Sequence, residues 1–454
     1  MFRSTARLIL PLALLVLWVC LPANVSAKKL SDDDLVDRVA ALYNPNGPNT
    51  SNYSGTSLIK MVESRWDNLS KDHQKRIVNY LDEPIRSGPG APEGQKSFET
   101  EHFQIIYQTK GTDACAGGDA DGNGLADYAE EVANYLEQAW AKEVVEFGFK
   151  APPGSDKAKV RCHIKNINHN GLTHAATGKT AWIEMNNDIA AYTIRLIGEE
   201  SAKAIVVDPD GLQAGMLKAC CAHEFFHCIQ AAYDWEEDNW WCEGTAEWAG
   251  DAVFPESKFY TNNVSPRFKN PHVSLFSTEG WYEYASSIWA FYLAENYGGA
   301  DIIRQIWEGC ASKNVVEATE DAIGDLEEQF LYYACYNYLR AYADGERYPE
   351  MKALALEGAG TVTSEGLEAP QHFGTNYFTV PAANISKITV SLTQGQRGGV
   401  RLATISSGRW KIMPHVMKDG HFEVSLSDET IDTVIIAIAG YQGEGELGYT
   451  LTVE

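Results

Sequence analysis

The sequence predicts an α+β fold in which strands come first, helices follow, and an antiparallel β-sandwich ends the chain. Three observations support this prediction. Between about residues 100 and 210, four short runs rich in apolar, β-branched and aromatic residues are separated by polar segments. From 211 to 343, apolar residues recur at helical spacing. From about 370, strand-like runs alternate with glycine, serine and asparagine.

The first 27 residues have the pattern of a secretory signal peptide. Arg3 and Arg7 precede an apolar run over 8–21, and small residues end at Ala27. The run is short for a membrane span and no basic stop-transfer cluster follows it. We therefore expect cleavage near Ala27, a secreted protein and no stable membrane anchor.

The charge balance and the cysteines agree with an extracellular protein. The 454 residues include 62 acidic and 37 basic ones, a net charge of −25, which disfavours nucleic acid as a partner. One of the nine cysteines lies in the leader, and the remaining even number permits disulfides. Cys310 and Cys335, on two neighbouring predicted helices, form the pair that we expect.

Residues 28–97 are polar and partly helical. Apolar spacing predicts one helix over 57–83, with Ser54 or Thr56 as its cap, and the composition of 87–97 is typical of a linker. The region is either a propeptide or a helical layer on the main domain, and the pattern does not distinguish between the two.

Two further regions complete the predicted organisation, a main domain over 98–350 and a β-sandwich over 365–454. The strands expected in the main domain cover about 99–109, 158–166, 179–187 and 203–209. Its expected helices cover about 126–147, 211–234, 242–253, 283–297, 301–310 and 322–343.

The helix predicted over 211–234 carries the clearest chemical pattern, HEFFH. His223 and His227 are one turn apart on one face, which is the spacing that a tetrahedral zinc requires of two imidazoles. Glu224 projects beside them and is the expected general base. The alternative, two buried histidines beside a buried glutamate, would leave polar groups in an apolar helix without partners.

A second acidic segment follows in WWCEGTAEW. After a turn through WEEDN, a helix beginning near Glu243 would return this glutamate to the two histidines as the third ligand. Two histidines, a glutamate and an open fourth position are typical of catalytic zinc. Glu247, one turn later, is either an orienting partner of a ligand imidazole or an exposed glutamate.

These motifs resemble those of the gluzincin metallopeptidases, in which HExxH is followed by a glutamate in an E-G-x-A-E context. HEFFHxxQxxYD, WWxEGTAxW and YASSIWAFYLAENYG are more closely similar to a group of secreted bacterial metalloproteases, over about residues 100–310. The resemblance implies a zincin-like domain, zinc on His223, His227 and Glu243, and Glu224 as general base. The gap between His227 and Glu243 is shorter than in thermolysin, so the specificity does not transfer.

Related enzymes often use a tyrosine or histidine to stabilise the oxyanion that forms when water attacks a peptide carbonyl. Tyr282 and Tyr284 in GWYEYASS are the candidates, with aromatic packing as the alternative. We select Tyr284 because it lies inside the family-like segment. By the same analogy, the strand over 179–187 could pair with a substrate backbone as an edge strand.

DADGNGLADYAEE matches the calcium-loop pattern D-x-[DN]-x-[DN]-G-x5-E at every position. The expected ligands are Asp119, Asp121, Asn123, the Leu125 carbonyl, Asp127 and Glu130. A strand precedes the loop where an EF-hand has a helix, so we expect a structural Ca²⁺ and not a switch. The alternative is an acidic turn that caps the following helix.

The sequence as a whole predicts a secreted zinc metalloendopeptidase that acts on protein or peptide substrates and holds a catalytic Zn²⁺ and a structural Ca²⁺. The alternatives are a catalytically silent zinc-binding adhesion protein and a matrix- or carbohydrate-binding protein whose function lies in the sandwich. Glu224 favours the enzyme, since a silent scaffold needs the ligands but not the base.

Overall fold

A computed structural model describes residues 30–45, 47, 53–84, 92–176, 178–383, 385–414, 417, 420–426, 430–443 and 445–454. The predicted signal peptide lies outside these residues. No helix in the described part of the chain is long and apolar enough to cross a bilayer.

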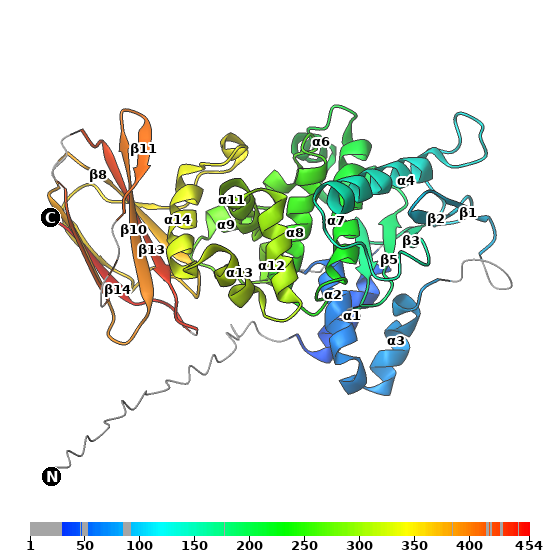
Figure 1. The fold of residues 1–454 in the computed structure, drawn as a ribbon, viewed down its shortest axis with the longest axis horizontal. Helices are drawn as coiled ribbons and strands as arrows, with labels where there is room; N and C mark the ends of the chain where they lie inside the picture. The colour runs from blue at the N-terminus through cyan, green and yellow to red at the C-terminus, as the bar shows by residue number, and fades with distance from the viewer. Residues whose placement is uncertain are drawn as a thin grey trace, which may run out of the picture.

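A five-stranded mixed sheet forms the base of the main domain (Figure 1). Its strands are β1 (Gln95–Glu99), β2 (Phe103–Gln108), β3 (Val160–Lys165), β4 (Gly171–His174) and β5 (Trp182–Asn186), in the order β1-β2-β3-β5-β4. The three central strands are parallel, and both outer strands run antiparallel to their neighbours.

Helices cover both faces of this sheet. On one face, α4 (Asp127–Trp140) and α7 (Leu212–Gln230) share a core with the inward side chains of β2, β3 and β5. On the other, α1 (Asp32–Leu42), α2 (Gly55–Arg65) and α3 (Lys71–Leu81) form a separate cluster that includes Ile167 and Leu172. Successive side chains of β3 point to opposite faces of the sheet, as in any strand. Cys162 and Ile164 face α7, whereas His163 faces the N-terminal helices.

A helical layer follows, centred on α8 (Asn239–Val253), which packs against α7. Gly250 allows a close crossing, because a Cβ there would lie 3.2 Å from the Ala219 carbonyl oxygen. The remaining α-helices are α5 (Ile189–Ile197), α6 (Glu199–Ile205), α9 (Ser265–Lys269), α10 (Tyr282–Ala285), α11 (Ser287–Tyr297), α12 (Ala300–Cys310), α13 (Val315–Ile323) and α14 (Leu326–Leu339). Short helical turns are η1 (Trp66–Asn68), η2 (Ala141–Glu146), η3 (Phe259–Asn262), η4 (Glu279–Trp281) and η5 (Gly345–Arg347).

Two sheets form the C-terminal region and share a core of their own. One has the order β11-β10-β13-β8-β6 and the other β12-β9-β14-β7. Their strands are β6 (Leu354–Ala355), β7 (Gly360–Thr363), β8 (Thr375–Pro381), β9 (Lys387–Leu392), β10 (Gly398–Ser406), β11 (Arg409–Ile412), β12 (His421–Ser425), β13 (Thr433–Gly440) and β14 (Tyr449–Val453). The outer face of the first sheet packs on α14, where the Tyr377 hydroxyl donates to the Ala334 carbonyl at 2.9 Å.

The α+β class is confirmed, but several sequence predictions about elements are wrong. The expected strand over 203–209 is the end of α6 and a loop, because the helix-forming run before it continues to Ile205 and is supported by a Glu199–Lys203 pair. In place of the single helix expected over 57–83, α2 and α3 are separated by η1, and Ser70 caps the start of α3. Ser54 caps α2, as one of the two alternatives had it.

The expected edge strand and the expected disulfide are also wrong. Strand β5 is interior, and the short strand β4, which lies between two of the expected strands, forms the edge. Cys310 and Cys335 are free thiols in different surroundings. Cys310 neighbours Glu237 and Cys242, whereas Cys335 lies near Arg401.

Candidate metal centre

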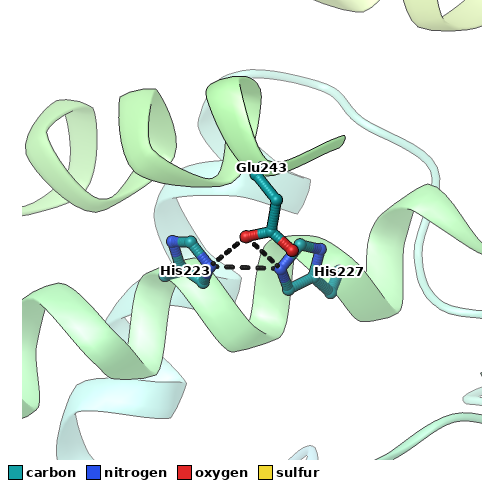
Figure 2. A group of neighbouring side chains, drawn as sticks. All are labelled: His223, His227 and Glu243. Carbon is teal, nitrogen blue, oxygen red and sulfur yellow. Dashed lines mark hydrogen bonds and ion pairs between the residues drawn. The ribbon is translucent and has the colours of Figure 1, made fainter. Parts of the chain in front are cut away.

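Three buried ligand atoms meet where α7 and α8 pack together. The Nε2 atoms of His223 and His227 are 3.1 Å apart, and Glu243 Oε2 lies 3.2 and 3.5 Å from them (Figure 2). Zinc bonds of about 2.0–2.1 Å at tetrahedral angles would place ligand atoms roughly 3.3 Å apart. Glu243 Oε2 is buried without a hydrogen-bond partner among the described residues, so the triangle fits a metal ion.

Neighbouring side chains hold both imidazoles in the orientation that a metal requires. Gln230 Oε1 lies 2.8 Å from His227 Nδ1, and its amide donates to the Cys242 carbonyl at 2.8 Å. Glu247 Oε1 lies 3.4 Å from His223 Nδ1, and Asn263 donates to the other Glu247 oxygen at 2.9 Å. With each Nδ1–H directed to an oxygen, each Nε2 is left as the ligand atom.

The carboxylates of the centre have opposite protonation preferences. Burial raises the pKa of Glu243, but the imidazoles of His227 and His223 outweigh burial and hold it well below its usual range. Burial raises the pKa of Glu283 well above its usual range, and the charge of Glu243 raises it further. Burial lowers the pKa of His223, but Glu243 and Glu247 outweigh it and raise that pKa well above the ordinary value. The geometry thus keeps Glu243 anionic and Glu283 neutral.

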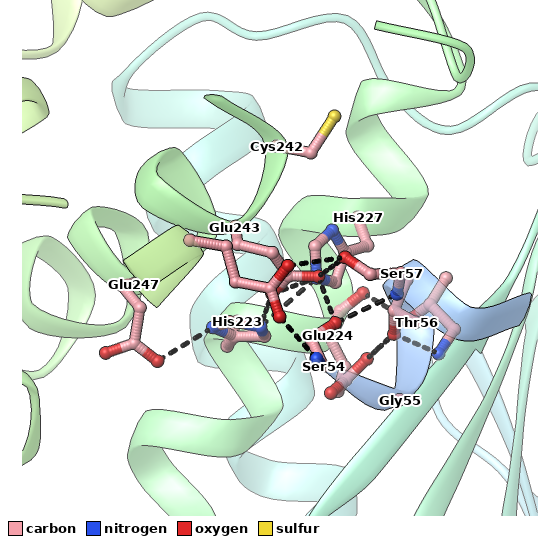
Figure 3. Close-up of polar contacts among 12 residues, drawn as sticks. Ser54, Gly55, Thr56, Ser57, His223, Glu224, His227, Cys242, Glu243 and Glu247 are labelled. Atoms are coloured by element: carbon pink, nitrogen blue, oxygen red, sulfur yellow. Dashed lines mark hydrogen bonds and ion pairs between the residues drawn. The ribbon is translucent and has the colours of Figure 1, made fainter. Parts of the chain in front are cut away.

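Glu224 lies against the edge strand, on the same helix as the two histidines (Figure 3). The Thr173 hydroxyl donates to Glu224 Oε2 at 2.7 Å, which fixes the carboxylate beside the metal ligands. A Cβ on Gly171 would come within 2.6 Å of Glu224 Cγ, so only glycine fits there without displacing the carboxylate.

A cavity of about 450 Å³ adjoins the centre. His223, Glu224 and Tyr284 line it, together with mainly apolar side chains between residues 192 and 281. The Tyr284 ring lies 5.9 Å from the His223 ring, and burial raises the pKa of its phenol well above the usual value, so it remains a proton donor. Trp281, which stacks on Tyr284, has a φ of 70°, a strained conformation for a large side chain.

The start of α2 lies over the opposite side of the centre (Figure 3). The Ser54 hydroxyl donates to Glu243 Oε1 at 2.5 Å, and the Ser57 hydroxyl lies 3.2 Å from the same oxygen. The Ser54 backbone N–H donates to Glu283. Thr56 Oγ1 is 3.5 Å from Glu224 Oε2 and accepts from the Thr173 backbone N–H at 3.1 Å.

The expected calcium loop brings only part of its residues together. Carboxylate oxygens of Asp119, Asp121 and Asp127 lie within 4.8 Å of one another. Asn123 joins the loop through its amide, which donates to Asp121 at 3.0 Å and to Glu130 at 2.9 Å. The backbone N–H of Leu125 donates to Asn123 Oδ1 at 2.8 Å. Calcium binding here remains a prediction.

Sequence reasoning missed the roles of several residues at the centre. Gln230 stood in the HEFFHxxQ pattern, three residues after His227, but no role was assigned to it. Glu283 carried no signal, since one acid among aromatic residues is common. Ser54 was expected only as a helix cap, because its contact with Glu243 joins residues far apart in the chain.

Comparisons with known proteins give a family for this chain. Residues 93–397 match the family described as "Family of unknown function (DUF6055)". No curated protein matches the chain. Among solved structures, the chain is similar to the pre-peptidase C-terminal domain of a collagenase from Bacillus anthracis, at 16% identity and a TM-score of 0.18, over 23% of this chain and 95% of that one.

Proposed function

The chain belongs to the DUF6055 family, whose function is unknown, and we propose that it is a secreted zinc-dependent metalloendopeptidase. The observation that carries this proposal is Glu224, a carboxylate held beside the His223–His227–Glu243 triangle at the wall of a cavity. A purely structural metal site needs no such base. The resemblance of HEFFH and WWCEGTAEW to gluzincin motifs supports the same assignment.

In the proposed peptide hydrolysis, zinc, Glu224 and Tyr284 have separate roles. Zinc at such a site activates water and polarises a carbonyl. Glu224 takes the proton of the attacking water and passes it to the leaving amine. Tyr284, neutral and buried in the cavity wall beside His223, is the proposed donor to the oxyanion.

The surroundings favour a peptide as the substrate. The cavity is lined by Leu196, Ile197, Ile205, Met216, Phe259 and other apolar residues, which suit a large apolar side chain. Strand β4 is the sheet edge nearest Glu224, and its Thr173 N–H points away from β5. An extended substrate backbone could add to this edge.

Two further parts of the proposal concern the setting of the enzyme. The leader over 1–27 would export the chain, and the loop around Asp119, Asp121 and Asp127 would bind Ca²⁺ as a stabiliser. Neither is needed for the catalytic assignment.

Glu224→Gln tests the proposal most sharply. Zinc-loaded wild type and variant are incubated with a mixed peptide library, and the products are read by mass spectrometry. Each protein is tested intact and after its own chain has been cut between residues 84 and 92, because a propeptide over 28–97 would block activity. We expect internal cleavages by the wild type, a rate about 10²–10⁴-fold lower for the variant, and equal zinc content. Glu308→Gln, at an exposed residue paired with Arg304, is the control and should retain full activity.

Zinc-loaded protein that cleaves no peptide in either form would reject the peptidase assignment. It would favour the silent zinc-binding alternative. Equal rates for wild type and Glu224→Gln would reject Glu224 as the base.

A further inference from the structure

We infer that residues 30–84, here called the N-terminal segment, are a detachable cover that closes the β4 side of the candidate metal centre until the segment is released. This inference rests on the proposed function and concerns the regulation of the same site. It is drawn from what the first turn of α2 touches and from how the segment is attached to the rest of the molecule.

The first turn of α2 forms hydrogen bonds with the carboxylates at the metal centre. Ser54 and Ser57 both direct hydroxyls at Glu243 Oε1, at 2.5 and 3.2 Å. The Ser54 N–H and the Ser57 hydroxyl also reach Glu283, the second at 3.3 Å. All these side chains are buried, so the contacts exclude water from this side of the centre.

The same turn of α2 also contacts Glu224, the proposed general base, and strand β4 at the edge of the sheet. Thr56 Oγ1 approaches Glu224 and accepts the outward N–H of Thr173, the backbone group that a substrate strand would need. Gly55 packs so closely that a Cβ there would lie 2.1 Å from Leu172 Cδ2. A substrate paired with β4 and placed near Glu224 would therefore have to displace α2.

The segment nevertheless has a core of its own. Of the twelve buried residues in its apolar cluster, only Ile167 and Leu172 come from outside it. Much of its remaining attachment is polar, as in an interface between separable parts. Tyr43 donates to Glu184 at 2.7 Å, Arg161 donates to Glu83 at 2.6 Å, and Lys60 donates to the Glu237 carbonyl at 2.9 Å.

The connection to the main domain suits release. The sequence SGPGAPEG over 87–94 is typical of a linker, and the family match begins at residue 93, after the segment. Hydrolysis of one peptide bond between residues 84 and 92 consumes one water and leaves a carboxylate on the segment and an amine on the remainder. The segment would then be held by its interface alone.

The test uses the full chain with a site for a sequence-specific protease placed between residues 84 and 92. Two readouts that do not depend on catalysis are measured before and after cleavage and gel filtration. One is the rate at which a chromogenic pyridylazo chelator extracts zinc, and the other is hydrogen exchange of the peptide that contains Thr173. We expect extraction to accelerate at least about tenfold and Thr173 to lose protection, since even one hydrogen bond to a carboxylate corresponds to roughly that factor.

A matched pair of variants tests the contact without cleavage. Ser54→Ala combined with Ser57→Ala removes both hydroxyls from Glu243 and one helix cap. Ser70→Ala removes only the equivalent cap of α3, which makes no contact with the centre in the described structure. The double variant should extract zinc several-fold faster than Ser70→Ala, and Ser70→Ala should match the wild type.

The outcomes separate this inference from the proposed function. Unchanged extraction and unchanged Thr173 exchange in both the cleaved chain and the double variant would overturn the cover. Faster extraction and exchange would support the cover, whether or not peptides are hydrolysed. Failure of the released, zinc-loaded protein to cleave peptides would count against the peptidase assignment alone.

Discussion

Gln230 supports the metal centre through His227. Its side chain accepts from one ring nitrogen and donates to the Cys242 carbonyl on the facing helix, so the ring is fixed with its other nitrogen toward Glu243. Such partners set both the orientation and the basicity of a ligand imidazole. The centre therefore depends on more residues than its three ligands.

Replacement of Gln230 should weaken metal binding. In Gln230→Ala the His227 ring loses its orienting acceptor, and we expect zinc affinity to fall about 10–100-fold, measured by competition with a chromogenic chelator. Gln213→Ala is the matched control, because Gln213 lies on the same helix but donates to Glu131. Equal affinities for the two variants would contradict the orienting role.

At the residue scale, the sequence predicted the functional residues that lie within short motifs. HEFFH placed two histidines and a glutamate on one helix turn, and Glu243 followed from the second acidic segment. The roles of Gln230, Glu283 and Ser54 at the metal centre were not predicted, because these roles depend on contacts with residues of other elements. A periodic pattern carries no information about such contacts.

Among the elements, β4 and the N-terminal helices determine what reaches the centre. Strand β4 has only four residues, GLTH, which is too short for a periodic signal, so it was not among the expected strands. The run over 203–209 looked like a strand by composition, but the helix before it extends into it. A long apolar element such as α7 was predicted well, because packing and local preference agree there.

The docking of the N-terminal helices should weaken in acid. Burial raises the pKa of Glu83, but hydrogen bonds from His163 and Arg161 outweigh it and lower the pKa to about 2. This carboxylate therefore contributes stability that is complete above its ordinary pKa of 4.5 and is lost as pH falls toward about 2.

Glu83→Gln removes that contribution at every pH. Between pH 5 and pH 2.5 we expect the melting temperature of the wild type to fall more steeply than that of the variant, by calorimetry. Glu101→Gln, at an exposed residue, should follow the wild type. Parallel curves for wild type and Glu83→Gln would show that the carboxylate contributes nothing to docking.

In the whole molecule, the five-stranded sheet lies between two helical layers, one of which contains α7, the helix that carries His223 and His227. Helices α4 and α7 cover one face, the N-terminal segment covers the other, and the C-terminal sheets attach through α14 (Figure 1). The order of strands followed by helices predicted the class. The placement of the N-terminal segment over the centre could not be predicted, since it depends on contacts such as Tyr43 with Glu184.

The acidic loop before α4 should stabilise the whole molecule in calcium. Ion binding to the native state alone adds roughly 2.7 kcal/mol at a hundredfold excess over Kd, which should raise the melting temperature by about 2 °C or more. Chelation should reverse the shift, and Asp121→Ala should abolish it. A melting temperature unmoved by calcium would show that the loop is only an acidic turn before α4, which begins without a side-chain cap.

The most direct test of the account is the zinc X-ray absorption spectrum of the zinc-loaded chain. We expect imidazole nitrogen and carboxylate oxygen ligands at about 2.0–2.2 Å. Cys220 and Cys242 lie near the centre, but the buried group of ligand atoms that could hold the ion contains only His223, His227 and Glu243. Sulfur scatterers at about 2.3 Å, or a spectrum unchanged by Glu243→Ala, would contradict the assignment of zinc to His223, His227 and Glu243.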